Sequence, residues 1–178
     1  EFMTSEGRQK AYDQLKEKGI EGLVAIGGNG TFTGAEIFYN EFKIPCVGAP
    51  GTIDNDLYGT DYTIGYDTAV NTALDAIDKI RDTADSHDRV FFIEVMGRDS
   101  GYIAIECGIA GGAEAVMIPE NLTPVSEIVA ILQKGFAKAK SSSIVVVAEG
   151  DEEGNAQIIA KKIKESMNAE LDIRVTTL

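Results

Sequence analysis

The chain has 178 residues, of which 44% are hydrophobic, and its formal net charge at pH 7 is −13. This length and apolar fraction are sufficient for a folded protein with a sizeable core. The excess of acidic residues argues against nucleic acids and anionic membrane surfaces as partners, because proteins that bind them are usually basic.

The first predicted strand leads into a glycine-rich loop. Residues 23–26 are an apolar run, and Gly27-Gly28-Asn29-Gly30-Thr31 follows directly. Where such a loop opens a helix, its backbone N–H groups can approach a phosphate. A glycine-rich turn can also serve only to reverse the chain.

The second predicted strand, residues 44–49, leads into an acidic loop that runs from Pro50 to Asp56. Ligands of open parallel sheets bind beyond the carboxyl ends of the strands, which is where this loop would lie. Asp and Asn are also common turn formers and helix caps. A phosphate cradle and a carboxylate loop on successive strands together favour phosphoryl transfer, which needs a bound polyphosphate, a metal ion and a base.

Helices and strands alternate through the rest of the chain. A helix is predicted after Gly65, because apolar residues recur there at three- and four-residue steps, namely Ala69, Val70, Ala73, Leu74, Ile77 and Ile80. Residues 90–95 predict a buried parallel strand that ends at Met96-Gly97-Arg98, and residues 144–148 predict another that ends at Glu149. This alternation predicts a layered α/β fold.

Two further helices are predicted from capping signals. One begins with Thr123 as the cap and Pro124 in the first turn, and it points Ile128, Ile131 and Leu132 inward. The other is capped by Asn155 and continues through Ile158, Ile159 and Ile163. Leu178 ends the sequence within an apparent strand.

Motifs along nearly the whole chain resemble the 6-phosphofructokinases, which phosphorylate fructose 6-phosphate at its 1-hydroxyl with MgATP or, in one branch, with pyrophosphate. The motifs follow in order and at the family's spacing, at residues 27–31, 50–56, 59–65, 80–83, 86–89 and 94–98. The seven-residue acidic motif is highly specific, whereas the glycine loop also resembles that of NAD and lipid kinases.

The resemblance implies a three-layer α/β phosphofructokinase-type fold with parallel-rich sheets and two domains. Residues 1–65 would be part of the ATP-binding domain, and residues 66–178 would form the fructose 6-phosphate-binding domain. Glu1 and Leu178 do not coincide with the family's ends, so we expect a fragment of the full enzyme that is inactive alone. With no signal peptide, lipidation motif or long apolar span, we expect a cytoplasmic glycolytic enzyme that has no membrane or nucleic-acid partner.

The resemblance also assigns the catalytic and nucleotide-binding residues. Asp54 would be the base that accepts the sugar hydroxyl proton, while Thr52 and Arg98 would stabilise the transferring phosphoryl group. Asp56 and Asn29 would support Mg²⁺. The residues implied for ATP binding are Gly28, Asn29, Gly30 and Thr31.

The implied sugar-binding set includes arginines from a neighbouring subunit. In the family, the counterparts of Arg89 and Arg174 reach into the next subunit and bind the 6-phosphate, which implies a homo-oligomer, expected as a homotetramer, with shared active sites. The full substrate-binding set is Thr52, Ile53, Asp54, Arg89, Met96, Gly97, Arg98, Glu149 and Arg174.

The resemblance also implies an allosteric site for an ADP effector. Its residues would be Arg81, Gly112, Glu114, Lys138 and Lys140. These side chains also fit ordinary solvated helix positions, and the lysines follow the charge pattern of any helix carboxyl end.

Three positions of the glycine and acidic loops bear on cofactor use. The family usually has Asp where this chain has Asn29, and an amide supplies an oxygen ligand without negative charge. The change is a tolerated variant, an altered metal requirement or a sign of weakened catalysis. Gly30 and Gly51 match ATP-using members, since pyrophosphate-using members commonly carry Asp and Lys there.

Two alternative functions stay open. The first is a phosphofructokinase-like binding or regulatory protein with impaired catalysis, suggested by Asn29 but opposed by Thr52, Asp54, Asp56 and Arg98. The second is a kinase of the NAD or lipid kinase class that shares the glycine loop.

Overall fold

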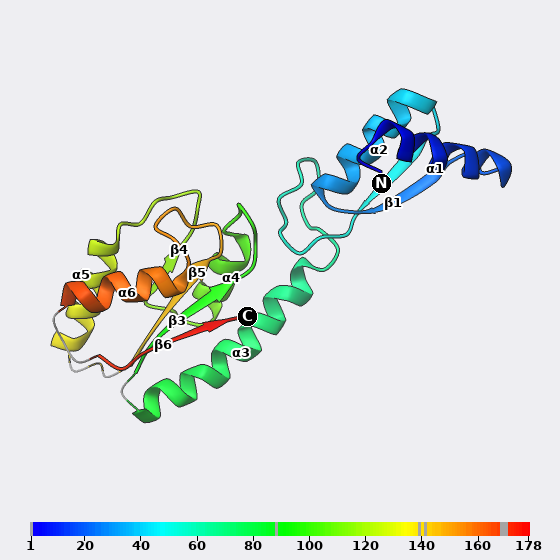
Figure 1. Ribbon diagram of the computed structural model, residues 1–178. Coiled ribbons are helices and arrows are strands. Elements are labelled where there is room, and N and C mark those ends of the chain that lie inside the picture. Colours follow the sequence, from blue (N-terminus) through cyan, green and yellow to red (C-terminus); the bar gives the residue numbers. More distant parts are fainter. Residues whose placement is uncertain (1, 88, 139, 141, 168–170) are drawn as a thin grey trace. The chain divides into compact units, whose positions relative to one another are not determined.

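The computed structural model describes residues 2–87, 89–138, 140, 142–167 and 171–178. Contacts between residues divide the chain into two compact units (Figure 1). The first unit contains Glu1–Thr52 and Leu57–Gly65, and the second contains Ile53–Asp56 and Tyr66–Leu178.

The first unit has a two-stranded parallel sheet with helices. Its elements in chain order are α1 (Ser5–Glu17), β1 (Leu23–Gly27), α2 (Asn29–Phe42) and β2 (Cys46–Pro50). Leu23 lies opposite Cys46 and Gly27 opposite Pro50, so both strands end at the same edge. The second strand begins two residues later than predicted, because Pro45 has no N–H to donate to the ladder.

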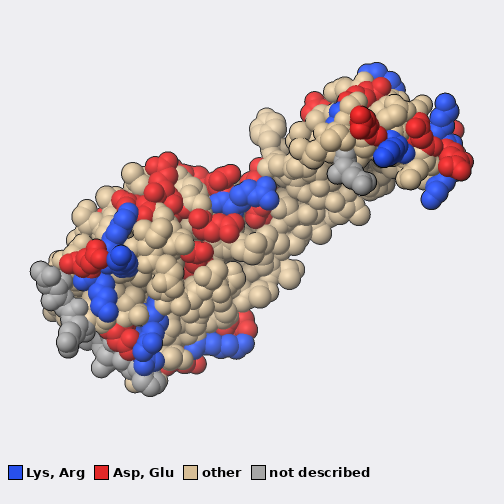
Figure 2. All heavy atoms as spheres, in the orientation of Figure 1, with Lys and Arg blue, Asp and Glu red and all other residues tan. Residues whose placement is uncertain are grey.

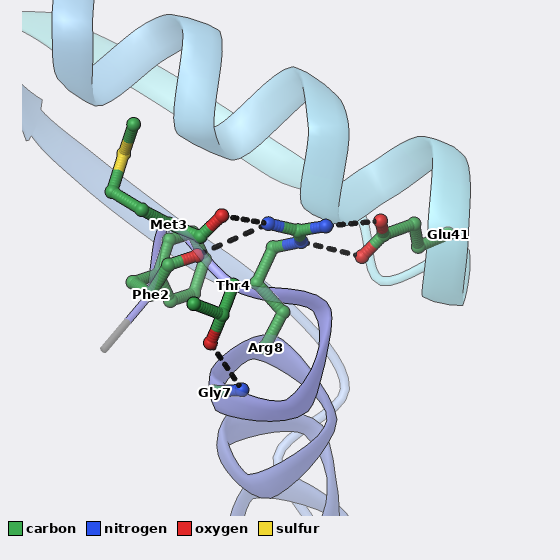
Figure 3. A network of polar contacts seen from close by, with 6 residues as sticks. All are labelled: Phe2, Met3, Thr4, Gly7, Arg8 and Glu41. Carbon is green, nitrogen blue, oxygen red and sulfur yellow. Dashed lines mark hydrogen bonds and ion pairs between the residues drawn. The ribbon is translucent and has the colours of Figure 1, made fainter.

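Arg8 fastens α1 to α2 (Figure 3). Its Nε and Nη2 donate to the two carboxylate oxygens of Glu41 over 2.7 and 2.6 Å, and its Nη1 donates to the carbonyl oxygens of Phe2 and Met3. Thr4 caps α1 by accepting a hydrogen bond from the N–H of Gly7. Because α1 has no buried residue, no apolar pattern in the sequence predicts this helix.

The second unit is built on a four-stranded parallel sheet. Its strands are β3 (Val90–Val95), β4 (Ala115–Met117), β5 (Ser143–Ala148) and β6 (Ile173–Thr177), in the order β4-β5-β3-β6. The predicted α/β class with parallel sheets is therefore confirmed.

Two helices cover each face of this sheet (Figure 1). α3 (Tyr66–His87) and α4 (Tyr102–Ala110) pack against one face, where Phe91, Ile93 and Val95 point. α5 (Val125–Ala137) and α6 (Ala156–Met167) pack against the other, where Val90 and Phe92 point. Since β3 is buried on both faces, its residues form the continuous apolar run seen in the sequence.

The capping signals predicted both α5 and α6, but the cap of α5 was assigned to the wrong residue. Asn155 caps α6, since its Oδ1 accepts a hydrogen bond from the N–H of Ile158. This helix runs through Ile158, Ile159 and Ile163 as predicted, and the Ile158 side chain is 49% exposed. Pro124 rather than Thr123 is the cap residue of α5, because its extended backbone, with ψ 145°, places it before the first turn.

Of the helices in the described part of the chain, none combines the length and the apolar character needed to cross a membrane.

Candidate active site

In the first unit, the glycine loop joins β1 directly to α2. Gly28 is the cap residue of α2 and contributes no side-chain cap to the N–H groups of the first turn, which are the groups that bind anions at helix starts. A Cβ at Gly27 would lie 2.2 Å from Oγ1 of Thr31, so this turn requires glycine. A Cβ at Gly28 would lie 3.4 Å from Cβ of Thr52, which places Thr52 beside the loop.

Gly30 and Gly51 differ in their surroundings. A Cβ at Gly30 would meet no atom within 4 Å, so this position is open. A Cβ at Gly51 would lie 3.0 Å from Cγ2 of Ile26 and 3.4 Å from the backbone nitrogen of Gly27. A side chain at position 51 would therefore press on the glycine loop itself.

In the second unit, Asp54 lies in the acidic loop and is only 9% exposed. The hydroxyl of Ser100 donates a 2.8 Å hydrogen bond to the backbone carbonyl of Asp54. The neighbouring Ile53 packs against the core formed by α3, α4 and the sheet. These contacts fix the position of the Asp54 backbone beside the turn that follows β3.

That turn, Met96-Gly97-Arg98, has an unusual backbone. Gly97 has φ 148° and Arg98 has φ 54°, a left-handed conformation that is uncommon for a residue with a side chain. Oε1 of Glu149 accepts hydrogen bonds from the N–H groups of Gly97, at 3.3 Å, and of Arg98, at 2.6 Å. Glu149, at the end of β5, therefore holds the strained turn at the end of β3.

Two residues that the sequence did not single out lie close to the segment from Arg98 to Gly101. Glu120 accepts hydrogen bonds from the N–H of Gly101 through both carboxylate oxygens, at 2.8 and 3.0 Å, where α4 begins. A Cβ at Gly150 would lie 2.1 Å from the carbonyl oxygen of Arg98. The guanidinium of Arg98 is exposed and has no hydrogen bond or ion pair within the described residues.

Arg89 and Arg174 lie at the opposite end of the sheet. Both contact Asp172, which precedes β6, with Nε–O distances of 2.6 Å from Arg89 and 2.9 Å from Arg174. The hydrogen bond from Arg89, followed by that from Arg174, lowers the pKa of the Asp172 carboxyl below its ordinary 3.8. Since β3 has six residues, the two ends of the sheet are about 20 Å apart. These arginines therefore do not join Arg98 and Glu149 of the same chain.

The residues predicted to bind an effector also lie toward the amino end of the sheet. Arg81 donates a hydrogen bond to the carbonyl of Gly111, and its guanidinium would contact a Cβ at Gly112. Glu114 accepts hydrogen bonds from Nζ of Lys140 and from the N–H of Ile144. The fifth predicted residue, Lys138, is exposed at the end of α5.

Few side chains in the described part of the chain could bind a metal ion together. In the part of the chain that the structure describes, no three His, Cys, Asp or Glu side chains gather as a metal site. Mg²⁺ is usually held by one or two carboxylates together with substrate phosphates, so a site with Asp56 as its carboxylate fits this ion better than a metal that needs an all-protein cage. Asp88, within one of the matched motifs, lies outside the described residues.

Comparisons with known proteins agree with these features. The chain is 65% identical over 178 residues to the ATP-dependent 6-phosphofructokinase of Cytophaga hutchinsonii, covering 100% of this chain and 54% of that protein. It is 58% identical over 178 residues to ATP-dependent 6-phosphofructokinase 1 of Thermus thermophilus, covering 100% of this chain and 55% of that protein. The chain thus spans about half the length of the curated relatives it matches.

A solved structure shares the fold. The phosphofructokinase of Saccharomyces cerevisiae matches with a TM-score of 0.87 and 34% identity, over 99% of this chain and 27% of that one. The family model described as phosphofructokinase matches residues 1–178. Because that model covers the chain from end to end, the chain belongs to the phosphofructokinase family.

Proposed function

We propose that the protein containing this chain transfers a phosphoryl group from ATP to the 1-hydroxyl of fructose 6-phosphate, yielding fructose 1,6-bisphosphate. The observation that carries the proposal is the turn after β3, where Glu149 holds Arg98 and Ser100 binds the backbone of Asp54. An arginine, a carboxylate acceptor and a candidate base thus meet in one unit. The ATP-dependent names of the relatives agree with this reaction.

Asp54 is the proposed base. Phosphoryl transfer passes through a loose transition state, so the carboxylate mainly has to orient the sugar hydroxyl and accept its proton. Arg98 and Thr52 would bind the transferring group, the arginine through its planar set of N–H donors. Glu149 uses Oε1 for the backbone turn, which leaves Oε2 for a sugar hydroxyl. Ile53, Met96 and Gly97 complete this proposed sugar contact.

The start of α2 is proposed to bind the phosphates of ATP. The N–H groups near Gly28, Gly30 and Thr31 are suited to anionic oxygens, and no side chain at Gly28 covers them. Mg²⁺, when bound, would neutralise charge on the phosphates, with Asp56 and Asn29 as the proposed protein ligands. The open position at Gly30 supports ATP rather than pyrophosphate as the donor.

Shared active sites in a homo-oligomer, expected as a homotetramer, complete the proposal. Arg89 and Arg174 lie about 20 Å from Arg98, so they would serve a sugar phosphate bound to another subunit. Residues 1–65 and 66–178 are the proposed nucleotide and sugar domains of a cytoplasmic glycolytic enzyme. Arg81, Gly112, Glu114, Lys138 and Lys140 are the proposed contacts of an ADP effector.

The test is Asp54→Ser in the complete enzyme, with the exposed Asp78→Ser as the matched control. We expect turnover to fall by about 10³-fold for Asp54→Ser, because a positioned base contributes 10²- to 10⁴-fold, while KM for fructose 6-phosphate changes little. Asp78→Ser should leave both constants unchanged. A coupled assay with ATP and with pyrophosphate measures them, and near-normal turnover of Asp54→Ser excludes the assigned base.

Asn29 favours a second candidate, a sugar-binding protein with impaired catalysis. An amide supplies no negative charge for Mg²⁺, so Asn29→Asp should lower the Mg²⁺ concentration needed for half-maximal turnover. Sugar binding without turnover in both versions would support the binding protein instead. The same Mg²⁺ titration curve for both versions would show that the amide at position 29 does not change the dependence of turnover on Mg²⁺.

A further inference from the structure

Asp172 is the common partner of two arginines from neighbouring strand starts. Arg89 donates a hydrogen bond through Nε to Oδ2 at 2.6 Å, and Arg174 donates one through Nη2 to Oδ2 at 3.4 Å. Nε of Arg174 also lies 2.9 Å from Oδ1 in an ion pair. Within the described residues, the terminal nitrogens of Arg89 make no hydrogen bond. The carboxylate therefore holds the Nε edges of the guanidinium groups and leaves terminal N–H donors for another anion.

The pairing of β3 with β6 fixes the backbone positions of Arg89, Asp172 and Arg174. The N–H of Val90 donates to the carbonyl of Asp172 at 3.1 Å, and Phe91 pairs with Arg174 in the ladder between β3 and β6. All three charged residues therefore lie at or next to the first paired residues of β3 and β6. The distance between the two arginine backbones is set by the sheet, so only their side-chain directions depend on Asp172.

The cluster carries one negative and two positive charges in a chain whose net charge is −13. Two guanidinium groups side by side repel each other, and the carboxylate between them offsets that repulsion. A net positive charge with unused planar donors suits a phosphate group, which binds arginine through paired hydrogen bonds.

We propose that Asp172 is a positioning residue that orients Arg89 and Arg174 for the phosphate of the sugar substrate. The inference rests on the proposed function and adds a residue to it. Asp172 does not itself bind the sugar phosphate, because both are anionic. It acts by keeping two long, mobile side chains in the conformation that a phosphate needs, so it contributes to sugar affinity and not to the chemical step.

Two effects of removing the carboxylate oppose each other. Loss of its charge reduces repulsion of the incoming phosphate, but the Asp172 side chain is 43% exposed, so solvent screens this repulsion. Loss of its hydrogen bonds frees two side chains that each have high rotamer entropy. The second effect is the larger, and the affinity for the sugar phosphate falls.

The test compares Asp172→Asn, Asp172→Ala and Asp172→Glu in the complete enzyme, with Asp75→Asn as the control. Asp75 forms an exposed ion pair with Lys79 on α3, so its loss reports the effect of removing any surface pair. We expect KM for fructose 6-phosphate to rise about tenfold in the Asn and Ala variants, while kcat and KM for ATP stay within about twofold. Asp172→Glu should recover most of the affinity, and Asp75→Asn should change nothing.

An unchanged or lower KM for fructose 6-phosphate in Asp172→Asn, with an active parent enzyme, overturns the positioning role alone. A fall in kcat and in kcat/KM by the same factor also overturns it, because that pattern indicates a general structural role. A parent enzyme that does not phosphorylate fructose 6-phosphate refutes the proposed function, so the two failures are distinguishable.

Discussion

Gly150 shows how closely the backbone segments approach at the end of the sheet. A Cβ there would lie 2.1 Å from the carbonyl oxygen of Arg98 and 3.3 Å from Cα of Asp99. These are backbone atoms of a turn whose Arg98 already has φ 54°, so neither can move aside without changing the direction of the arginine.

We therefore expect Gly150→Ala to lower turnover of the complete enzyme by about 10²-fold, since a displacement of about 1 Å at a catalytic group can cost that much. Gly135→Ala is the matched control, because a Cβ there meets no atom within 4 Å and lies in helix α5. This control should keep full turnover and gain up to about 1 kcal/mol of stability from helix propensity. Steady-state kinetics and thermal unfolding measure both, and equal turnover of the two variants would contradict the prediction.

Asp151 is a buried carboxyl whose charge is poorly compensated. Its Oδ1 accepts a hydrogen bond from the N–H of Glu153, whereas Oδ2 has no partner among the described residues. Burial raises the pKa of this carboxyl above its ordinary 3.8, and the nearby Glu153 and Glu152 charges act in the same direction. The folded state thus binds this proton more tightly than the unfolded state. Its contribution to stability is present below pH 3.8 and is lost as pH rises through the raised pKa.

For this reason, Asp151→Asn should gain stability relative to the parent as pH rises from about 4 to 7. Thermal unfolding midpoints of both proteins across that range give the difference at each pH. Asp75→Asn, which removes an exposed carboxylate, should show no comparable trend. A difference that does not change with pH would mean that Asp151 is not the titrating group.

A sequence motif reveals the role of a residue only when that role depends on residues nearby in the sequence. Asp54, Arg98 and Glu149 were visible as polar residues directly after predicted strands. Asp172, Glu120 and Gly150 gave no such signal, because their partners are Arg89, Gly101 and Arg98, which are distant in the chain. Only the assembled sheet brings these pairs together.

At the scale of elements, the start of α6 depends on two separate side chains. Oδ1 of Asn155 accepts from the N–H of Ile158 at 3.0 Å, and Oε2 of Glu94, on β3, accepts from the N–H of Ala156 at 2.8 Å. These bonds satisfy two of the N–H groups that a helix start leaves unpaired. They also tie α6 to the strand that it covers.

Asn155→Ala should weaken this helix start by about 1 kcal/mol, which is the usual cost of losing a cap. We expect amide exchange in the first turn of α6 to become about fivefold faster, since 1 kcal/mol corresponds to that factor. Hydrogen–deuterium exchange of the complete protein measures it. Asn155→Asp keeps the acceptor and should exchange like the parent, and equal rates for Ala and Asp variants would show that the cap contributes nothing.

Strong periodicity explains which elements could be predicted. α3 and β3 were predicted because α3 has an apolar face and β3 is apolar throughout. β4 has three residues, too few for a pattern, and α1 is held by polar contacts of Arg8 instead of by buried side chains. Element boundaries moved where proline changes the backbone, at Pro45 and Pro124.

At the scale of the whole molecule, basic side chains occur in small groups among the more numerous acidic ones (Figure 2). On the face shown in Figure 2, lysine and arginine side chains lie in small groups beside acidic ones, without a continuous basic patch. In such a protein, paired arginines such as Arg89 and Arg174 provide a local positive charge for an anionic sugar phosphate. The two ends of the sheet are about 20 Å apart, which is why the proposal assigns this pair to the sugar phosphate of another subunit.

Mixing two inactive variants of the complete enzyme tests the shared site. Asp54→Ser removes the proposed base and Arg174→Ala removes a proposed phosphate ligand, so each alone should have little activity at low sugar concentration. After dissociation and reassembly of an equal mixture, hybrid pairs contain one intact site, and about a quarter of the parent activity should return. No recovery after mixing, with assembly verified by light scattering, would place both residues in a site within one chain.

Changing the selectivity of the proposed sugar site by protein engineering would meet a constraint at Glu149. One carboxylate oxygen is committed to the N–H groups of Gly97 and Arg98, and only the other is available to a ligand. A shorter side chain chosen for a different hydroxyl pattern would also release the left-handed backbone of Arg98. New selectivity at this position would therefore require a second substitution that provides a replacement acceptor for the turn.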